Sequence, residues 1–208
     1  MRPADVAYGE DEDAWLPRAR EAATRGPLGH HTHWTAPHHA RPSADGRPGE
    51  RVLAEGRRLR ELDLRPTLFC GGGWYGDEGV AEACVELGYV DCTATAYRPA
   101  YLPPDAPWLA LAAPGWVVLP SGKRLLELPS THSLGAAARA MVTVAGPRAD
   151  VVHVHFHDTD LLDRRRRTAL LWTLRLLGLR RRVTDLDALA AAVAETAPEV
   201  PFEQVAAG

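Results

Sequence analysis

The sequence predicts an α/β fold in which mostly parallel strands are covered by helices. The first observation behind this prediction is the order of the elements, because short apolar segments typical of strands alternate with segments of helical periodicity. The second is size, since 208 residues with 46% hydrophobic and 25% charged side chains suit one globular domain. The chain has no internal repeat and no convincing linker, so residues 1–208 are interpreted as a single domain.

The individual elements follow from apolar spacing. Residues 1–27 lack clear periodicity and are expected to form a poorly defined N-terminal segment, with one short helix from about Asp13 to Ala23. Strands are predicted at residues 28–34, 67–70, 89–95, 115–120, 124–129 and 151–157. Helices are predicted at residues 49–63, 133–144, 161–178 and 185–195, with one more between Asp77 and Gly88.

Caps and breakers set several of these boundaries. Asp77 stands where a helix N-cap is needed, and Gly88 is placed to end the same helix. Gly178 is expected to end the helix that follows the last strand. Pro and Gly are frequent in residues 36–50 and 98–107, which are therefore predicted to be loops.

Composition excludes several classes of protein. The chain has no run of 18 apolar residues, so a membrane-spanning helix is not expected. The acidic N-terminus has no apolar segment typical of a secretory signal, so a cytoplasmic location is predicted, with export open if the N-terminus is incomplete. Three cysteines without a CxxC pair suit a reducing compartment. The net charge of −3 gives no reason to expect nucleic acid, and the oligomeric state is not predicted.

Histidine is concentrated in two distant segments. Five of the nine histidines lie between residues 30 and 39, and three lie between 153 and 157. In an extended segment His31 and His33 share one face, with Thr32 and Trp34 opposite, so their rings can bind one metal ion about 2 Å from each nitrogen. By the same alternation His153, His155 and His157 share a face. The alternative is that these side chains are hydrogen-bonded polar residues on a loop-rich surface.

A glycine loop at residues 71–73 lies between a predicted strand and a predicted helix. It lacks both GxGxxG and GK[ST], so an anion-binding loop is the weaker interpretation. A site loop is favoured, in which Gly72 and Gly73 let the backbone approach a ligand and Trp74 and Tyr75 supply an aromatic wall. A simple turn with two packed aromatic residues is the remaining alternative.

Two other patterns suggest no specific chemistry. Arginine runs at 164–167 and 180–182 bracket an apolar helix, which fits either a membrane or nucleic-acid patch or, more commonly, a solvated helix face. Ser130 and His132 are close in sequence, but adjacency is no evidence for a catalytic triad and no GxSxG motif is present.

Four segments in order resemble the polysaccharide deacetylase superfamily, the group with the NodB homology domain that includes carbohydrate esterase family 4. The resemblance covers about residues 28 to 195. It rests on LGHHTHWTAP, PTLFCGGGWYGDEGVAEACVELGYVDCT, ELPSTHS and VVHVHFHDTD. The order of the segments is more specific than any one of them.

This resemblance implies a distorted (β/α)7-type barrel, apparently incomplete at its N-terminus. It also implies a hydrolase that uses a divalent metal, usually zinc, to remove acetyl groups from N- or O-acetylated sugars. By position His31 and His33 would bind the metal, although the second family histidine usually lies four residues on, where Thr35 stands. His157 would be the general acid. The expected substrate-binding residues are Trp34, Gly72, Gly73, Trp74, Tyr75 and His155.

The chain departs from the family pattern at the catalytic base. The first motif, an apolar strand that ends in two aspartates, is absent, and Cys70 and glycines stand where the family has an orienting arginine. Asp158 or Asp160 is the candidate substitute, with Asp158 preferred. Two alternatives stay open: a carbohydrate-binding barrel that has lost its base, and a truncated reading frame.

Overall fold

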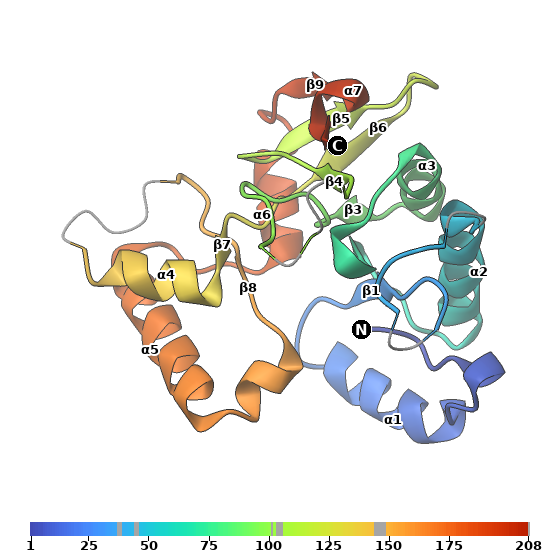
Figure 1. The fold of residues 1–208 in the computed structure, drawn as a ribbon, viewed down its shortest axis with the longest axis horizontal. Helices are drawn as coiled ribbons and strands as arrows, with labels where there is room; N and C mark the ends of the chain where they lie inside the picture. Colours follow the sequence, from blue (N-terminus) through green and yellow to red (C-terminus); the bar gives the residue numbers. More distant parts are fainter. Residues whose placement is uncertain (37–38, 44–45, 101, 103–105, 144–148, 208) are drawn as a thin grey trace.

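The structure is a mixed α/β fold built around a mostly parallel sheet, which confirms the predicted class (Figure 1). This computed structural model describes residues 1–36, 39–43, 46–100, 102, 106–143 and 149–207. The main sheet has the strand order β1-β2-β3-β6-β5-β9, with every neighbouring pair parallel except the β5–β6 hairpin. Its strands are β1 Gly29–Thr32, β2 Leu68–Gly71, β3 Val90–Asp91, β6 Arg124–Glu127, β5 Gly115–Val118 and β9 Glu199–Pro201.

Two short sheets extend this layer. Strand β7 (His132–Ser133) pairs in parallel with β8 (Val154–His155), and β4 (Trp108–Leu109) pairs antiparallel with β10 (Ala206–Ala207). Hydrogen bonds link β3 to β8 through the chain that follows β6. The Ala96 N–H donates to the Ser130 carbonyl at 2.9 Å, and the Thr131 N–H donates to the His153 carbonyl at 2.9 Å. These bonds connect the sheet of β7 and β8 to the chain that follows β3 and β6.

Helices cover both faces of the main sheet. Helices α2 (Pro48–Glu61) and α3 (Glu78–Leu87) pack on one face around Phe69, and α6 (Leu186–Val193) packs on the other face around Leu68. Helices α4 (Leu134–Met141) and α5 (Arg164–Arg180) lie together beside β7 and β8 (Figure 1). The remaining helical segments are η1 Val6–Tyr8, α1 Glu12–Ala23, η2 Gly72–Trp74, η3 Asp158–Leu161 and α7 Phe202–Val205.

The capping signals behave as the sequence predicted at α3. The Asp77 carboxylate accepts the Val80 N–H at 2.8 Å, and Gly88 ends the helix in the left-handed region with φ 67°. The prediction that Gly178 ends α5 is wrong, because the helix continues to Arg180. A helical glycine costs only about 1 kcal/mol, and the packing of the buried Leu177 beside it offsets that cost.

The N-terminal segment is more regular than its sequence pattern suggested. Helix α1 is capped by the Asp11 side chain, which accepts the Ala14 N–H at 3.1 Å. Within α1 only Ala19 is buried, and it packs with Leu28 and Leu59. A helix with so narrow a buried face leaves only a weak apolar periodicity in the sequence.

The strand predicted at 151–157 is wrong in length. Only Val154–His155 is paired as β8, because its partner β7 is itself two residues long. Ladder hydrogen bonds need a neighbouring strand, and among the described residues β7 is the strand paired with β8. The apolar alternation of this segment therefore predicts where the strand lies but not how many of its residues pair with a neighbouring strand.

A pair of buried carboxyl groups lies between the main sheet and α3. Asp91 and Glu127 are paired across β3 and β6, and each residue is 1% exposed. The Asp91 carboxylate accepts the Thr93 N–H at 2.9 Å and the Thr93 hydroxyl at 2.6 Å, and Glu127 accepts the Ala94 N–H at 2.7 Å. Burial raises the pKa of both groups, and the neighbouring Asp91 charge raises the pKa of Glu127 further. Both groups therefore hold a proton to higher pH in the folded chain than in the unfolded chain, and the effect is stronger at Glu127.

This retained proton makes stability depend on pH. In the unfolded chain Glu127 ionises near its ordinary pKa of 4.5, whereas in the folded chain burial keeps its proton on to a higher pH. The free energy of unfolding is therefore expected to fall by about 1.4 kcal/mol per pH unit above that value, until the folded pKa is reached. Glu127→Gln keeps the hydrogen-bonding shape and is expected to abolish this component, which urea unfolding at pH 5, 6, 7 and 8 measures. Parallel curves for the two proteins would contradict the assignment.

Candidate functional site

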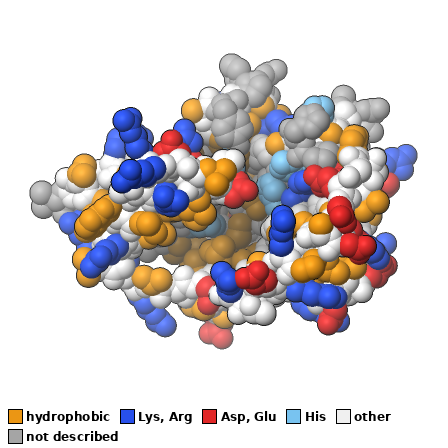
Figure 2. Space-filling model, turned by 90° about the horizontal axis from the view of Figure 1, so that it is seen from below, with side chains coloured by type: hydrophobic (Ala, Val, Ile, Leu, Met, Phe, Trp, Pro, Cys, Tyr) orange, Lys and Arg blue, Asp and Glu red, His pale blue; other side chains and the backbone are white. Residues whose placement is uncertain are grey.

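The predicted site residues gather at the carboxyl ends of β1, β2 and β8. His33 follows β1, the glycine segment η2 follows β2, and His157 follows β8. Ligand sites of parallel sheets form at this edge, because the loops that leave neighbouring strands converge there. The space-filling view shows a hollow between the half of the molecule that contains α4 and α5 and the half that contains α1 and α2, with histidine side chains at its border (Figure 2).

The first histidine pair has the arrangement that the sequence predicted. The ring centroids of His31 and His33 are 5.0 Å apart, in an edge-to-face orientation. The His31 Nδ1 lies 2.7 Å from the Cys70 carbonyl oxygen, so Nδ1 carries the proton and Nε2 keeps a free lone pair. Burial lowers the pKa of His31 to about 4, so this imidazole is neutral at neutral pH.

These two histidines fit two positions of a divalent-metal site. A metal-binding imidazole is neutral and typically donates its second nitrogen to a carbonyl or carboxylate, as His31 does to Cys70. Among the residues that the structure describes, no group of three or more His, Cys, Asp or Glu side chains could hold a metal ion. Among the described residues, His31 and His33 are therefore two candidate ligands, and the rest of a coordination shell is unassigned.

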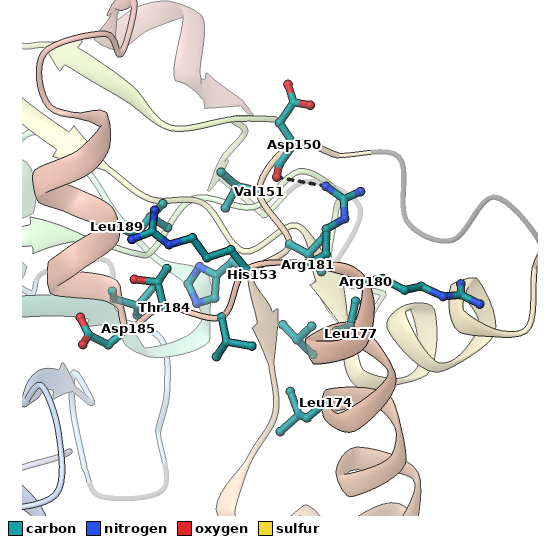
Figure 3. Close-up of a pocket in the computed structure, with 15 residues that line it drawn as sticks. Asp150, Val151, His153, Leu174, Leu177, Arg180, Arg181, Thr184, Asp185 and Leu189 are labelled. Carbon is teal, nitrogen blue, oxygen red and sulfur yellow. Dashed lines mark hydrogen bonds between the residues drawn. The ribbon is translucent and has the colours of Figure 1, made fainter.

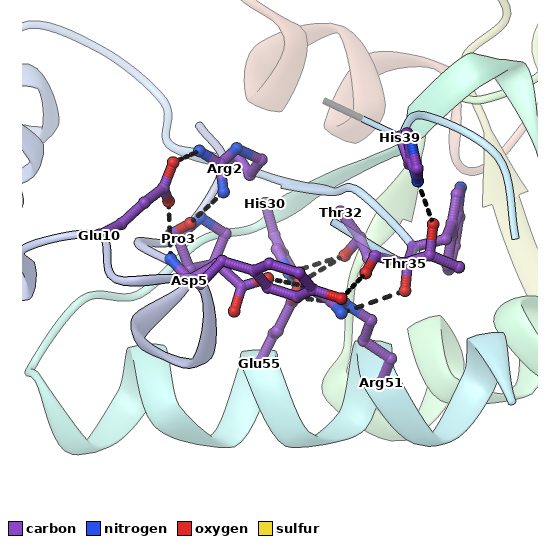
Figure 4. Close-up of polar contacts among 12 residues, drawn as sticks. Arg2, Pro3, Asp5, Glu10, His30, Thr32, Thr35, His39, Arg51 and Glu55 are labelled. Atoms are coloured by element: carbon purple, nitrogen blue, oxygen red, sulfur yellow. Dashed lines mark hydrogen bonds and ion pairs between the residues drawn. The ribbon is translucent and has the colours of Figure 1, made fainter. Parts of the chain in front are cut away.

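His30 supports this pair from the opposite face of β1, a role that sequence reasoning missed. Its Nε2 lies 3.0 Å from the Glu55 carboxylate, which also accepts the Thr32 hydroxyl at 2.8 Å (Figure 4). The Arg51 guanidinium donates to the second Glu55 oxygen at 2.8 Å. With His30 and Thr32 held against α2, alternation along the strand turns His31 and His33 to the other side. The sequence predicts the alternation along the strand, but it does not predict the contact between His30 and Glu55.

The glycine segment after β2 packs against the chain that follows β1. A Cβ on Gly72 would overlap the Thr32 carbonyl oxygen and lie 3.0 Å from the His33 ring, and a Cβ on Gly73 would lie 2.7 Å from the Ala40 carbonyl oxygen. Gly73 and Trp74 both have positive φ, at 60° and 58°. The close approach expected of these glycines is present, but the partner is the backbone of this chain.

The aromatic residues expected to form a sugar-binding wall are mostly covered. Trp34 is 5% exposed and Trp74 is 7% exposed. Trp34 belongs to the main core, packs edge-to-face on Tyr75 at 5.3 Å, and donates its Nε1–H to the Gly72 carbonyl at 2.9 Å. Tyr75 is half-buried, and its hydroxyl donates to Asp77 at 2.8 Å. Trp34 and Trp74 thus offer little free ring surface for a sugar, and Tyr75 offers more.

His155 connects the glycine segment to the second histidine cluster. Its ring centroid lies 4.6 Å from that of Trp74 and 6.3 Å from that of His157. The Tyr97 hydroxyl lies 2.7 Å from His155 Nδ1, and the two rings are nearly parallel at 20°. Burial, with the charge of His157 as a smaller cause, lowers the pKa of His155 to about 4. Tyr97 lies between the strand predicted at residues 89–95 and the loop predicted at residues 98–107, and no sequence motif predicted this contact.

Asp160, rather than Asp158, holds His157 in place. The His157 N–H donates to the Asp160 carboxylate at 3.0 Å, and the Asp160 N–H donates to the His157 carbonyl at 3.0 Å. Arg166 donates to the other carboxylate oxygen at 2.7 Å, and these hydrogen bonds lower the pKa of Asp160. Asp158 is exposed and its carboxylate accepts only the Thr159 N–H, at 2.8 Å, among the described contacts. Of the two, Asp158 has the freer carboxylate.

His155 and His157 line a cavity of about 400 Å³ that His31 and His33 do not line. Its wall includes Asp160, Arg166 and Ser133, the N-cap of α4. The segment Gly71–Trp74 lies between the two histidine clusters, since a Cβ on Gly72 would come within 3.0 Å of the His33 ring and the Trp74 ring centroid lies 4.6 Å from that of His155. The structure thus brings both clusters to one edge of the strands, on either side of this segment.

His153 does not join the other two histidines of its cluster. Its Nδ1 lies 3.2 Å from the Leu128 carbonyl oxygen, and its ring lines a separate cavity of about 720 Å³ between α5 and α6. Figure 3 shows His153 between Thr184 and Leu177 in this cavity. Burial lowers the pKa of His153, so it is neutral there.

Comparison of the chain with models of known protein families, with characterised proteins and with solved structures finds no match.

Proposed function

We propose that the chain is a divalent-metal-dependent hydrolase, with zinc as the expected metal, that removes acetyl groups from N- or O-acetylated sugars. The observation that carries this proposal is the convergence of two histidine clusters on the segment Gly71–Trp74, at the carboxyl ends of the strands. One cluster holds a neutral imidazole with a free lone pair, as a metal ligand requires. The other places His157 beside a cavity. Metal-assisted hydrolysis needs both a metal ligand and a proton donor.

The proposed fold for this function is a distorted (β/α)7-type barrel. The continuity of hydrogen bonds from β1 through β3 and Ser130 to β8 supports it, because a curved layer of parallel strands is the wall of such a barrel. In this arrangement the catalytic groups come from the ends of several strands.

The proposed mechanism assigns one role to each group. His31 and His33 would hold the metal, which would supply polarisation of the acetyl carbonyl and a lowered pKa of water. The Asp158 carboxylate takes a proton from the attacking water. Protonated His157 donates a proton to the leaving nitrogen or oxygen as the bond to the acetyl carbon breaks, which yields acetate and the free amine or alcohol. Asp160 acts as a positioning residue for His157, since both of its oxygens are already bonded.

Metal content tests the first part of the proposal. The purified chain, loaded with zinc and dialysed, is expected to retain the metal, and His31→Ala is expected to lose most of it because one of two described ligands is removed. Elemental analysis by mass spectrometry measures the ratio of zinc to protein. His132→Ala is the matched control, since His132 lies outside both clusters and bonds Thr131. Equal zinc content in His31→Ala and the parent chain would remove His31 from the site.

A carbohydrate-binding protein without catalysis is the second candidate. The observation that favours it is that no carboxylate joins His31 and His33 in a ligand group among the described residues. This candidate predicts binding of N-acetylated oligosaccharides in a calorimeter with no release of acetate. Acetate release from the same oligosaccharides, measured in the presence of zinc, distinguishes the two.

A further inference from the structure

The strongest segregation of charge in the molecule lies along α5 and the turn that follows it. Residues 164–184 contain eight arginines and no acidic side chain. The whole chain has 24 basic and 27 acidic side chains, so the remaining residues have 16 basic against 27 acidic. A strongly positive segment thus lies on an otherwise acidic protein, which favours an anionic partner.

Most of these arginines have no carboxylate partner. Arg166 is paired with Asp160 at 2.7 Å. Within the described ranges, no ion pair joins a carboxylate to Arg164, Arg165, Arg167, Arg175, Arg180 or Arg182. Their charge is therefore available to a partner, whereas arginines on α2 such as Arg57 and Arg58 are paired with glutamates.

The same helix exposes large apolar side chains. Leu171, Trp172 and Leu179 are 61%, 58% and 78% exposed. Leu171 and Trp172 are adjacent, and Leu179 follows them by eight and seven residues, about two helical turns. The three side chains therefore share the outer face of α5. The Arg175 guanidinium lies 5.9 Å from the Trp172 ring centroid on this face. The inner face is formed by Leu170, Thr173 and Leu177.

Apolar exposure continues beyond both ends of the helix. Leu162 before α5 and Val183 after it are 84% and 77% exposed. The space-filling view shows arginine and hydrophobic side chains interleaved over the half of the molecule that contains α4 and α5 (Figure 2). Scattered apolar residues are ordinary on a surface, but a row of them along one helix marks an interaction site.

We propose that the outer face of α5, defined by Arg164, Arg165, Leu171, Trp172, Arg175 and Leu179, docks onto an anionic lipid bilayer. Arginine suits the phosphate headgroups, and tryptophan and leucine suit the boundary between headgroups and acyl chains. A second copy of the chain would bring two arginine-rich faces together, and nucleic acid would leave Leu171 and Leu179 exposed. No helix within the described ranges is long and apolar enough to span a membrane.

Sedimentation with lipid vesicles tests this proposal. The full chain is expected to sediment with vesicles of 30% phosphatidylglycerol in phosphatidylcholine and not with pure phosphatidylcholine, because each arginine near the surface adds about 1 kcal/mol. The double variant R164A/R165A is expected to weaken the partition coefficient roughly thirtyfold. L171S/W172S is expected to weaken it roughly tenfold by removing inserted apolar area.

The matched control is the double variant R57A/R65A, which removes two exposed arginines from other surfaces and is expected to bind as the parent does. Equal binding by L171S/W172S and the parent, or stronger retention by a DNA duplex than by the anionic vesicles, would overturn the proposal. So would the absence of sedimentation at low salt. None of these readouts depends on acetate release, so the proposal stands or fails independently of the hydrolase assignment.

Discussion

His157→Ala is expected to lower acetate release by roughly 10²–10⁴-fold, the usual contribution of a positioned acid or base. The reason is that the leaving amine or alcohol loses its proton donor, while His31 and His33 still hold the metal. Initial rates on an N-acetylated oligosaccharide across pH 5 to 9 measure the change.

Two neighbouring substitutions show whether this effect is specific to His157. Asp158→Asn is expected to lower the rate to a similar extent, since the amide cannot accept the proton of the attacking water. Asp160→Asn is expected to reduce the rate less, because it disturbs only the hydrogen bonds that orient His157. A His157→Ala protein that retains normal zinc content and full activity would rule out His157 as the acid.

Gly72→Ala is expected to lower the free energy of unfolding by about 1–3 kcal/mol, which is typical of overpacking in a well-packed interior. The added methyl group would overlap the Thr32 carbonyl oxygen and press on the Ala40 carbonyl at 3.1 Å. Neither oxygen belongs to a flexible side chain, so the backbone itself must shift. Urea unfolding followed by circular dichroism measures the loss.

Gly29→Ala is the matched control on the neighbouring strand. A methyl group there would meet the Leu68 Cβ at 3.6 Å, an ordinary contact. This variant is expected to be as stable as the parent or slightly more so, because alanine also reduces the freedom of the unfolded chain. Equal stability of the Gly72 and Gly29 variants would contradict the close packing of the glycine segment.

Local signals made much of the fold predictable. Asp77 and Gly88 each act within a few residues of their own position, and the structure places each one as the cap that the sequence indicated. The lengths of β3 and β8 were not predictable in the same way. Strand length depends on a partner strand, and β7, the partner of β8, is only two residues long.

In the candidate site, too, local arrangements were predictable and long-range contacts were not. The pairing of His31 and His33 was readable because alternation along one strand determines it. The contacts of His30 with Glu55 and of His155 with Tyr97 join residues 25 and 58 positions apart, and no local pattern specifies them. The burial of Trp34 and Trp74 was likewise invisible, since an aromatic residue after a strand fits a core as well as a binding surface.

The segment Gly71–Trp74 touches His33 at one end and His155 at the other. A displacement of these four residues therefore moves both histidine clusters together. In the proposed hydrolase, the spacing between the metal-binding pair His31 and His33 and the proton donor His157 would therefore depend on this short stretch of backbone.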